Sequence, residues 1–380
     1  MKPYKFFFFT YAKKKNAIEE KRLTLIKEGL NQLNYITEEN FIIINSPKSR
    51  KKNFFRLNLL LIRFLNLYFL FIKSIIKSKK NFKPIVYMNV KNSLFFSISV
   101  LIFKIFNIKI IAEKGESLKV PNFLKKSEKI KVFFSSFMIK KFIYFCDIVF
   151  CNTDKLCDEL RPFNKNVKKL SSAIVDYNFF SNYKKKSIFF KKFKFKYICY
   201  SGSLEEEHNG AFTLLKAFAQ LNKTYKSIYL VFIGSKIEQN YENLLKSCKD
   251  LKVEKKVIFT NFLREENLKK FYQNASLLAI LKPFNERNTK NFPGKLSEYL
   301  STGNPVISTS VGSISKILKN RYTAFLVEEF SITKIVETLK FILNNETFAK
   351  KVGCAGQLIA KKEFDKTIVA KNLLKNLKTI

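Results

Sequence analysis

The sequence is poor in the residues on which metal sites and secreted folds depend. It has no tryptophan, a single histidine at His208, and six cysteines among which no C-x-x-C pair occurs. A zinc site built from Cys and His is therefore not expected, and free thiols favour a reducing cytoplasm. The apolar run at 6–10 is too short for a secretory signal and leads directly into three lysines.

Glycine is also scarce, and its ten residues are unevenly distributed. Gly29 and Gly115 are the only two before residue 200, whereas the other eight lie between Gly202 and Gly356. Glycine allows a backbone to approach a ligand closely and to adopt positive φ. The skew predicts that the second half of the chain holds the tight loops of a nucleotide site.

Acidic residues are few, because 30 Asp and Glu stand against 71 Lys and Arg, for a formal net charge of +41. So large a positive charge favours anionic partners: nucleic acid, anionic lipid or a phosphorylated substrate. The excess of lysine, together with 42 phenylalanines, fits equally well the compositional drift of a very AT-rich genome. The lysines are spread over the whole chain and no zinc-finger, leucine-zipper or RNA-binding motif is present, so sequence-directed nucleic-acid binding is not expected.

Strand-like and helix-like segments alternate through both halves of the 380 residues, a length that favours two domains. In the first half we expect strands at 5–11, 41–45, 85–89, 108–113 and 147–153, and helices that include 17–33 and 127–144. In the second half we expect strands at 197–203, 228–234, 257–261, 277–281, 305–309 and 324–327, and helices at 210–221, 238–249, 264–274 and 332–343. This alternation is typical of α/β folds, and it predicts two doubly wound parallel sheets. The boundary should lie within 178–196.

One apolar segment, residues 54–76, has the length of a membrane span. Arg56, Arg63, Asn66 and Lys73 interrupt it, and on a helix they share one narrow sector. A charge such as Arg63 near the bilayer centre argues against a span. Two interpretations stay open: a helix of the first domain with its basic stripe in solvent, or the same helix resting on an anionic membrane surface.

The most informative segment is 291–309, which reads NFPGKLSEYLSTGNPVIST. Pro293 suits a first helical turn, and Gly303 followed by Asn-Pro ends the helix before a buried strand. Lys295 and Glu298 are three residues apart and share a helix face. A cation and a carboxylate at the end of an α/β sheet suit a diphosphate and a ribose, so the segment predicts a sugar-nucleotide site. The alternative is a surface ion pair.

Segments of the second half resemble, in order, the donor-binding domain of glycosyltransferase family 4. They are YSGSL at 200–204, HNG at 208–210 with LLKAF at 214–218, YLVFIG at 229–234 with VIFTNF at 257–262, and 291–307, which is similar to the F-P-x-K-L-x-E-Y-L branch. The resemblance covers roughly 197–360, and the first half matches mainly in pattern. It implies the GT-B architecture, two Rossmann-like domains that face each other across a cleft. The domains would be 1–185 for the acceptor and 186–360 for the nucleotide sugar, with a C-terminal helix within 361–380 that returns to the first.

The same resemblance implies which residues hold the donor: Gly202, Ser203, His208, Lys282, Lys295, Leu296, Glu298, Gly312 and Ser313. Lys295 and Lys282 would stabilise the leaving diphosphate with positive charge in place of a metal, and Glu298 would accept hydrogen bonds from the ribose. Gly202 would pass close to the phosphates, and the helix after Gly210 would point its N-terminus at them.

Three departures from the family pattern put parts of this site in doubt. Ser203 stands where the family commonly has arginine, and Lys290 stands where the first acid of E-x7-E is expected. The first domain also lacks a histidine, so Glu113 and Glu116 in AEKGES are the candidates for a catalytic base. Their alternative is a solvated loop charge.

The function expected is therefore a retaining, metal- and cofactor-independent transfer from a UDP- or GDP-sugar, with Glu113, Glu116 and Lys295 as catalytic residues. The acceptor would be a polyprenyl-diphosphate-linked glycan or a surface polysaccharide or lipopolysaccharide, and the enzyme would lie on the inner face of the cell membrane. The alternatives are a sugar-nucleotide epimerase of the same fold, a catalytically impaired partner, and a basic nucleic-acid-binding protein.

Overall fold

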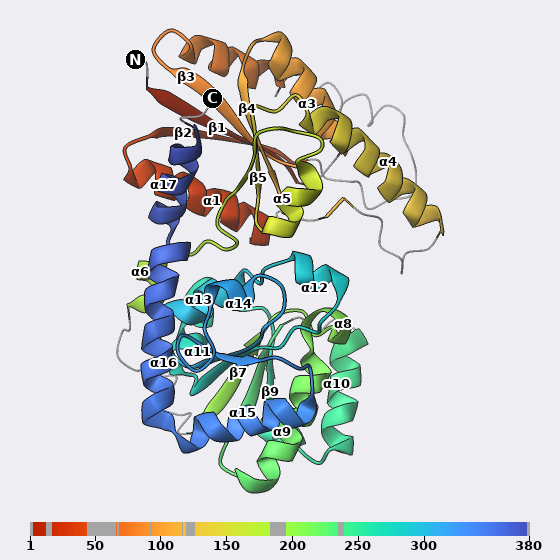
Figure 1. Cartoon of the computed structure of the whole chain (residues 1–380), viewed down its shortest axis with the longest axis vertical. Helices are drawn as coiled ribbons and strands as arrows, with labels where there is room; N and C mark the ends of the chain where they lie inside the picture. Colours follow the sequence, from red (N-terminus) through yellow and green to blue (C-terminus); the bar gives the residue numbers. More distant parts are fainter. Residues whose placement is uncertain are drawn as a thin grey trace. The chain divides into compact units, whose positions relative to one another are not determined.

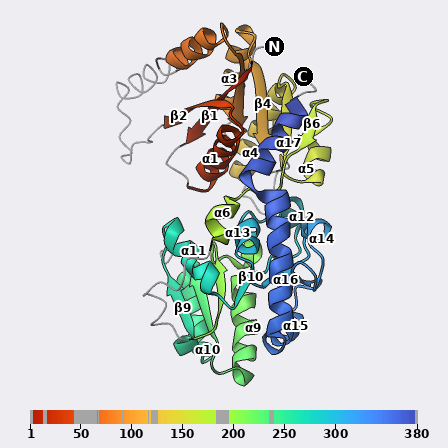
Figure 2. The same ribbon diagram turned by 90° about the vertical axis from the view of Figure 1, so that its left-hand side faces the viewer.

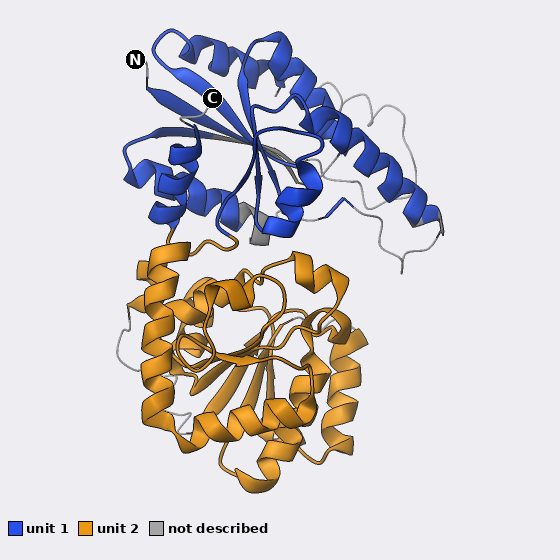
Figure 3. Cartoon of the chain, in the orientation of Figure 1, with its two compact units in different colours: residues 1–171, 366–380 blue, residues 172–365 orange. Residues whose placement is uncertain are grey.

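The computed structural model describes residues 3–12, 17–43, 66, 68–90, 93–115, 117–118, 126–182, 195–234 and 239–377. The chain divides into two compact units, one of residues 1–171 with 366–380 and one of residues 172–365 (Figure 3). Each described unit is built on its own six-stranded parallel sheet, with helices packed against it (Figure 1). These are two Rossmann-like α/β units, as the alternation of segments predicts.

In the first unit the strands are ordered β2-β1-β3-β4-β5-β6. They are β1 (Tyr4–Ala12), β2 (Ile36–Ile43), β3 (Lys83–Asn89), β4 (Lys109–Lys114), β5 (Ile148–Cys151) and β6 (Val167–Lys169). Phe6, Phe7, Phe8 and Phe9 of β1 are all almost completely buried. A strand covered on both faces requires such a continuous apolar run, and this explains the FFFF of the sequence.

Helices cover both faces of this sheet. They are α1 (Ala17–Gln32), α3 (Ser93–Ile105), α4 (Lys126–Ile143), α5 (Asp154–Leu160) and α17 (Lys366–Leu377). The C-terminal helix α17 lies against α1 (Figures 1 and 2). Gly29 of α1 makes this approach possible, since a Cβ there would lie 2.2 Å from the carbonyl oxygen of Lys366.

The second unit orders its strands β12-β11-β10-β7-β8-β9. They are β7 (Tyr197–Ser201), β8 (Tyr229–Ile233), β9 (Val257–Thr260), β10 (Leu277–Ile280), β11 (Val306–Thr309) and β12 (Phe325–Val327). Its helices are α6 (Tyr177–Ser181), α8 (Glu206–Asn209), α9 (Ala211–Thr224), α10 (Gln239–Asp250), α11 (Glu265–Asn274), α12 (Glu286–Lys290), α13 (Lys295–Ser301), α14 (Ile314–Ile317), α15 (Ile332–Asn344) and α16 (Glu346–Ile359).

The division between the units falls at 171/172, whereas the sequence analysis placed it at 185/186. The residues between these positions pack with the second unit, because Ala173, Val175 and Phe180 lie in its core. The backbone N–H of Val175 also donates to the carbonyl of Phe364 at 2.9 Å. The chain re-enters the first unit at residue 366, so the returning helix begins five residues later than 361.

The segment 54–76 lies mostly outside the described residues, which include 66 and 68–76 of it. Residues 68–78 are helical, and Tyr68, Phe71 and Ile75 pack into the core of the first unit. Lys73 on the same helix is exposed. Within the described parts of the chain, no helix combines the length and hydropathy that a membrane span needs.

Candidate functional site

The predicted donor residues lie where strands of the second unit's parallel sheet reach their carboxyl ends. Gly202 follows β7, Lys282 follows β10, and Gly312 and Ser313 follow β11. Open α/β sheets bind their ligands at this edge. The sheet order places β10 between β7 and β11, so these loops are neighbours.

Helix α13 is attached to the end of β7 by two hydrogen bonds that converge on Ser201. Lys295 Nζ donates to Ser201 Oγ at 3.0 Å, and the backbone N–H of Ser201 donates to the hydroxyl of Tyr299 at 2.7 Å. Glu298, on the same helix, is only 8% exposed, and Lys295 is half-buried. Neither side chain is a free surface charge, so the structure disagrees with the alternative of a surface ion pair.

Lys282 is buried at the end of β10 and holds the junction between α8 and α9. Its Nζ donates to the carbonyl of His208 at 3.2 Å and to Asn209 Oδ1 at 3.0 Å. Burial, with the positive charge of Arg287, lowers the pKa of Lys282 to about 8, although Glu205 opposes the shift. The ammonium is therefore held in place but poorly solvated, a state in which a bound anion would stabilise it strongly.

His208 lies in the last turn of helix α8 and is half-buried. Burial and the charges of Lys282 and Arg287 lower its pKa to about 4, so its imidazole is neutral at pH 7. In this structure it therefore adds no positive charge to the predicted donor site.

Two asparagines that the sequence analysis did not single out complete this cluster. Asn288 Nδ2 donates to the carbonyls of His208 at 3.2 Å and Pro283 at 2.9 Å, and Asn285 Nδ2 donates to the carbonyl of Glu207 at 2.6 Å. Asn285 is also the N-cap of α12, since its Oδ1 accepts from the N–H of Asn288. An N-cap asparagine three residues ahead of another polar residue is the signal that would have drawn attention to them.

The N-terminus of α9, which the sequence predicts to point at the phosphates, carries a side-chain cap in this structure. The Glu206 carboxylate accepts hydrogen bonds from the N–H of Phe212 at 2.7 Å and of Thr213 at 3.1 Å. A side-chain carboxylate thus already accepts from two N–H groups of the first turn and offsets part of its positive charge. The local sequence E-E-E before Gly210 supplies this cap.

The other predicted donor residues differ in what they can offer. Ser203 and Gly312 are half-buried and Ser313 is buried. Gly312 has a φ of 66°, and a Cβ there would lie 3.0 Å from the carbonyl oxygen of Asn288, so this turn requires glycine. Leu296 is fully buried in the core, and its N–H donates to the carbonyl of Pro293 at 2.9 Å. Its side chain and N–H are used within the fold.

Lys290, at the position of the missing family acid, forms an ion pair with Glu286 at 2.7 Å. The pair joins residues four apart on α12, and Glu286 is largely exposed.

The described part of the chain contains no group of three or more His, Cys, Asp or Glu side chains that could hold a metal ion.

In the first unit, Glu113 is a buried residue near the carboxyl end of β4. Arg22 Nε lies 2.5 Å from Glu113 Oε1, and the hydroxyl of Tyr87 donates to Oε2 at 2.9 Å. Despite its burial, the Arg22 guanidinium has a raised pKa because Glu113 is beside it, and burial with Glu113 raises the pKa of Tyr87. The alternative of a solvated loop charge is wrong for Glu113, and Glu116 lies outside the described residues.

Comparison with known proteins finds a family match in the second unit and fold likeness over the whole chain. Residues 182–358 match the family model described as Glycosyl transferases group 1. No curated protein matches the chain.

Three solved structures illustrate the fold likeness. HepE of Anabaena in complex with UDP-glucose is 15% identical, with a TM-score of 0.70 over 99% of this chain and 100% of its own. The sucrose-phosphate synthase of Thermosynechococcus elongatus is 14% identical, with a TM-score of 0.73 over 99% of this chain and 98% of its own. A glycosyltransferase from Rickettsia africae is 17% identical, with a TM-score of 0.71 over 99% and 98%.

At these identities the solved structures show the fold, which is GT-B, with two Rossmann-like parallel-sheet units. The match of residues 182–358 supports a glycosyltransferase of that fold. The narrower resemblance to family 4 and its F-P-x-K-L branch stays a prediction.

Proposed function

We propose that the chain is a retaining, metal-independent glycosyltransferase that moves a sugar from a UDP- or GDP-sugar to a lipid-linked or surface-polysaccharide acceptor. The family match in the second unit supports the reaction class. HepE, which shares the fold, was crystallised with UDP-glucose. We further propose that the protein acts peripherally on the inner face of the cell membrane, where such acceptors are presented.

The observation that carries the proposal is the attachment of α13 to the end of β7. Lys295 is held by Ser201 at 3.0 Å, and Glu298 lies less than one turn further along the same helix. In the proposed complex Lys295 contacts the diphosphate and Glu298 accepts from the ribose hydroxyls. Lys282 adds a second cation beside the phosphates, so the two lysines would stabilise the negative charge that develops on the leaving diphosphate.

Glu113, the candidate catalytic base, is buried in this structure. Both its oxygens are engaged, by Arg22 and by Tyr87. A carboxylate held in this way is well placed to orient its neighbours. To accept a proton from the acceptor, it would have to exchange one of these hydrogen bonds for the acceptor hydroxyl.

A catalytically impaired partner protein is the second candidate, favoured by Ser203 and by the ion pair of Lys290 with Glu286. Both positions replace residues that the family pattern uses for the donor. Such a protein would bind a nucleotide sugar without turning it over, so donor binding and nucleotide release have to be measured separately.

Calorimetric titration with UDP and GDP tests the donor site. We expect Glu298→Gln and Lys295→Met each to weaken binding by roughly tenfold or more, since each removes a charged hydrogen-bond partner worth about 1.5–3 kcal/mol. Glu337→Gln, which changes an exposed carboxylate paired with Lys334, is the matched control and should bind as the wild type does. Equal affinities in all four proteins would refute the assignment. Release of UDP or GDP from the corresponding sugar nucleotide then separates an enzyme from an impaired partner.

A further inference from the structure

Helix α3 presents an apolar stripe to the outside of the first unit. Leu94, Ile98, Leu101 and Ile105 are 63%, 38%, 49% and 78% exposed, and their spacing places them on one side of the helix. The opposite side is buried by residues such as Phe96 and Phe103. The helix is therefore apolar on both faces, and only one face is used by the core.

Helix α4 repeats this pattern. Ile130, Phe133, Phe134 and Phe137 are 52%, 60%, 62% and 49% exposed, at the spacing of a single helix face. Its inward side is formed by Ser136, Ile139 and Ile143, which are buried. Isolated surface phenylalanines are ordinary, but a row of them on one helix marks an interaction surface.

The two stripes lie on the same side of the first unit. The inward residues of α3 and α4 share one core cluster with Phe7 and Phe9 of β1, and α3 packs against α4. Both helices therefore cover the same face of the sheet (Figure 1). Helix 68–78 belongs to this cluster too, and its Phe69 and Leu70 are 67% and 61% exposed.

The charges on this side of the unit are almost all positive. Lys73, Lys77, Lys131 and Lys141 are exposed, and the only acidic residue within helix 68–78, α3 and α4 is Glu128. Lys141 Nζ lies 5.6 Å from the ring centre of Phe137, so cations and rings are interleaved. Lysines that flank exposed phenylalanines allow the rings to enter a lipid interface while the ammonium groups remain at the phosphates.

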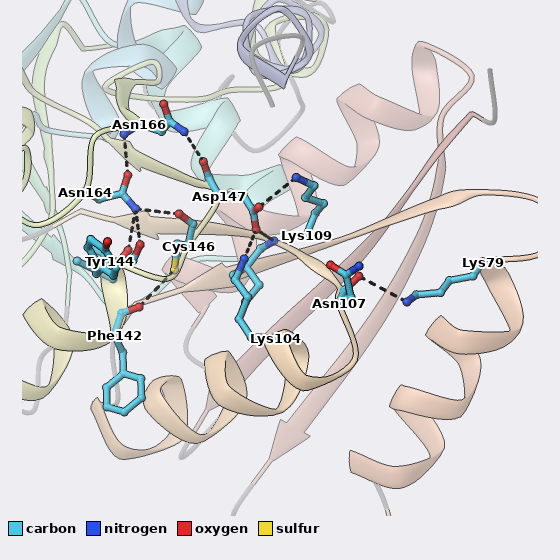
Figure 4. Close-up of polar contacts among 12 residues, drawn as sticks. Lys79, Lys104, Asn107, Lys109, Phe142, Tyr144, Cys146, Asp147, Asn164 and Asn166 are labelled. Atoms are coloured by element: carbon cyan, nitrogen blue, oxygen red, sulfur yellow. Dashed lines mark hydrogen bonds and ion pairs between the residues drawn. The ribbon is translucent and has the colours of Figure 1, made fainter.

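The ends of the helices are fixed by polar contacts (Figure 4). Lys79 Nζ donates to the carbonyl of Phe106 at 2.7 Å, which ties the turn after helix 68–78 to the end of α3. Asn164 Nδ2 donates to the carbonyls of Ile143 and Cys146 at 2.8 Å, which fixes the end of α4. The stripe residues are already exposed in this structure, so no rearrangement is needed to present them.

We infer that the outward faces of helix 68–78, α3 and α4 form a docking surface for an anionic phospholipid bilayer. A second copy of the chain fits this surface less well, because a symmetric contact would bring its lysines against the same lysines. The inference deepens the peripheral-membrane part of the proposed function, and it rests on residues that take no part in the donor site.

Vesicle co-sedimentation tests the surface. We expect the wild-type chain to sediment with vesicles of equal parts phosphatidylglycerol and phosphatidylcholine, and far less with phosphatidylcholine alone. Phe133→Ser with Phe134→Ser should lower the partition to the anionic vesicles by roughly tenfold per ring. Phe262→Ser, at a phenylalanine of the second unit that is 79% exposed, is the matched control and should sediment normally.

The lysines are tested in the same assay. Lys131→Glu with Lys141→Glu should markedly weaken the preference for phosphatidylglycerol, whereas Lys223→Glu with Lys226→Glu, exposed lysines of the second unit, should retain it. Unchanged UDP affinity in the Phe133 and Lys131 variants is expected, so loss of vesicle binding is distinguishable from failure of the donor assignment. The inference would be overturned if all variants sedimented equally with the vesicles. It would also be overturned if the wild type were a dimer and the phenylalanine variants were monomers.

The absence of tryptophan offers a direct readout of insertion. Phe133→Trp places a single tryptophan on the proposed surface, and Phe262→Trp places one on the second unit, so each can be excited selectively over the tyrosines. With phosphatidylglycerol vesicles the emission of the first should shift to the blue, and that of the second should stay constant. A constant spectrum in both proteins would show that Phe133 does not enter lipid.

Discussion

The ammonium of Lys282 lies 3.2 Å from the carbonyl oxygen of His208, in a buried position one residue beyond Leu281. The contact joins the end of β10 to the junction of α8 and α9, and Asn209 Oδ1 completes it at 3.0 Å. The pKa of Lys282 falls to about 8 because burial penalises the charged form and Arg287 repels it, although Glu205 opposes the shift. The cation is thus positioned in advance for an anionic ligand.

This contact predicts an alkaline rise in stability. Lys282 loses its proton near pH 8 in the folded chain and near 10.5 in the unfolded chain. Between these values the unfolded chain binds the additional proton, so the Lys282 contribution to the free energy of unfolding rises with pH, by at most about 3 kcal/mol. Urea unfolding across this pH window should show the rise in the free energy of unfolding of the wild type. Lys282→Met lacks the amine and should not show this contribution. Parallel pH profiles of the two proteins would contradict the prediction.

The same lysine predicts proton uptake on nucleotide binding. A diphosphate beside Lys282 favours its charged form, so UDP binding above about pH 8 should take up as much as one proton. Calorimetry in buffers of different ionisation enthalpy measures this number. Lys282→Met should bring it close to zero, whereas Lys316→Met, at an exposed lysine of α14, should leave it unchanged. Uptake that persists in Lys282→Met would assign the proton to another group.

Two glycines near the site predict opposite effects of the same substitution. Gly210 has a φ of 65°, and a Cβ there would lie 2.1 Å from the carbonyl oxygen of Leu281. Gly210→Ala should therefore lower the free energy of unfolding by roughly 3 kcal/mol or more. Gly294 is helical, with φ −55°, and a Cβ there would meet nothing within 4 Å.

Gly294→Ala should consequently be neutral or stabilise the chain by about 0.4–1 kcal/mol, through the lower entropy of the unfolded state. Chemical denaturation of both variants beside the wild type gives the comparison. A Gly210→Ala protein as stable as the wild type would show that the turn can shift away from β10.

Most strands could be predicted because buried parallel strands leave continuous apolar runs in the sequence. The strand expected at 277–281 is β10 at Leu277–Ile280, and the strand expected at 228–234 is β8 at Tyr229–Ile233. Strand β2 begins at Ile36, five residues before the predicted 41. The first half of the strand reads ITEE, and these polar residues give no apolar run from which a buried strand could be predicted. Strand β6 has only three residues, VKK, and carries no periodic signal.

Site residues could be predicted where a local motif contains them. Their contacts could not be predicted where the two partners lie far apart in the sequence. The spacing of Lys295 and Glu298 follows from the helix, but the contact of Lys295 with Ser201 joins residues 94 apart. Similarly, nothing local relates Arg22 to Glu113, 91 residues away. A helix N-terminus after glycine indicates a phosphate site, but three acids precede this glycine and one of them, Glu206, caps the helix.

The buried pair of Arg22 and Glu113 allows its structural and catalytic roles to be separated. Glu113→Gln leaves the guanidinium without its counter-ion, and breaking a buried pair in this way should cost about 3–5 kcal/mol of stability. Adding Arg22→Leu removes the uncompensated charge, so the double variant should recover much of that loss. Chemical denaturation of the three proteins measures both effects.

Turnover of the folded variants then tests catalysis, with UDP affinity as the control. If Glu113 accepts the acceptor's proton, Glu113→Gln should lower kcat by a factor on the order of 10²–10⁴ with unchanged UDP binding, and the double variant should remain inactive although its stability is restored. If Glu113 serves only to hold the first unit together, turnover should recover in parallel with stability. The double variant therefore distinguishes the two roles, because only a structural role is rescued when the buried charge is removed together with its partner.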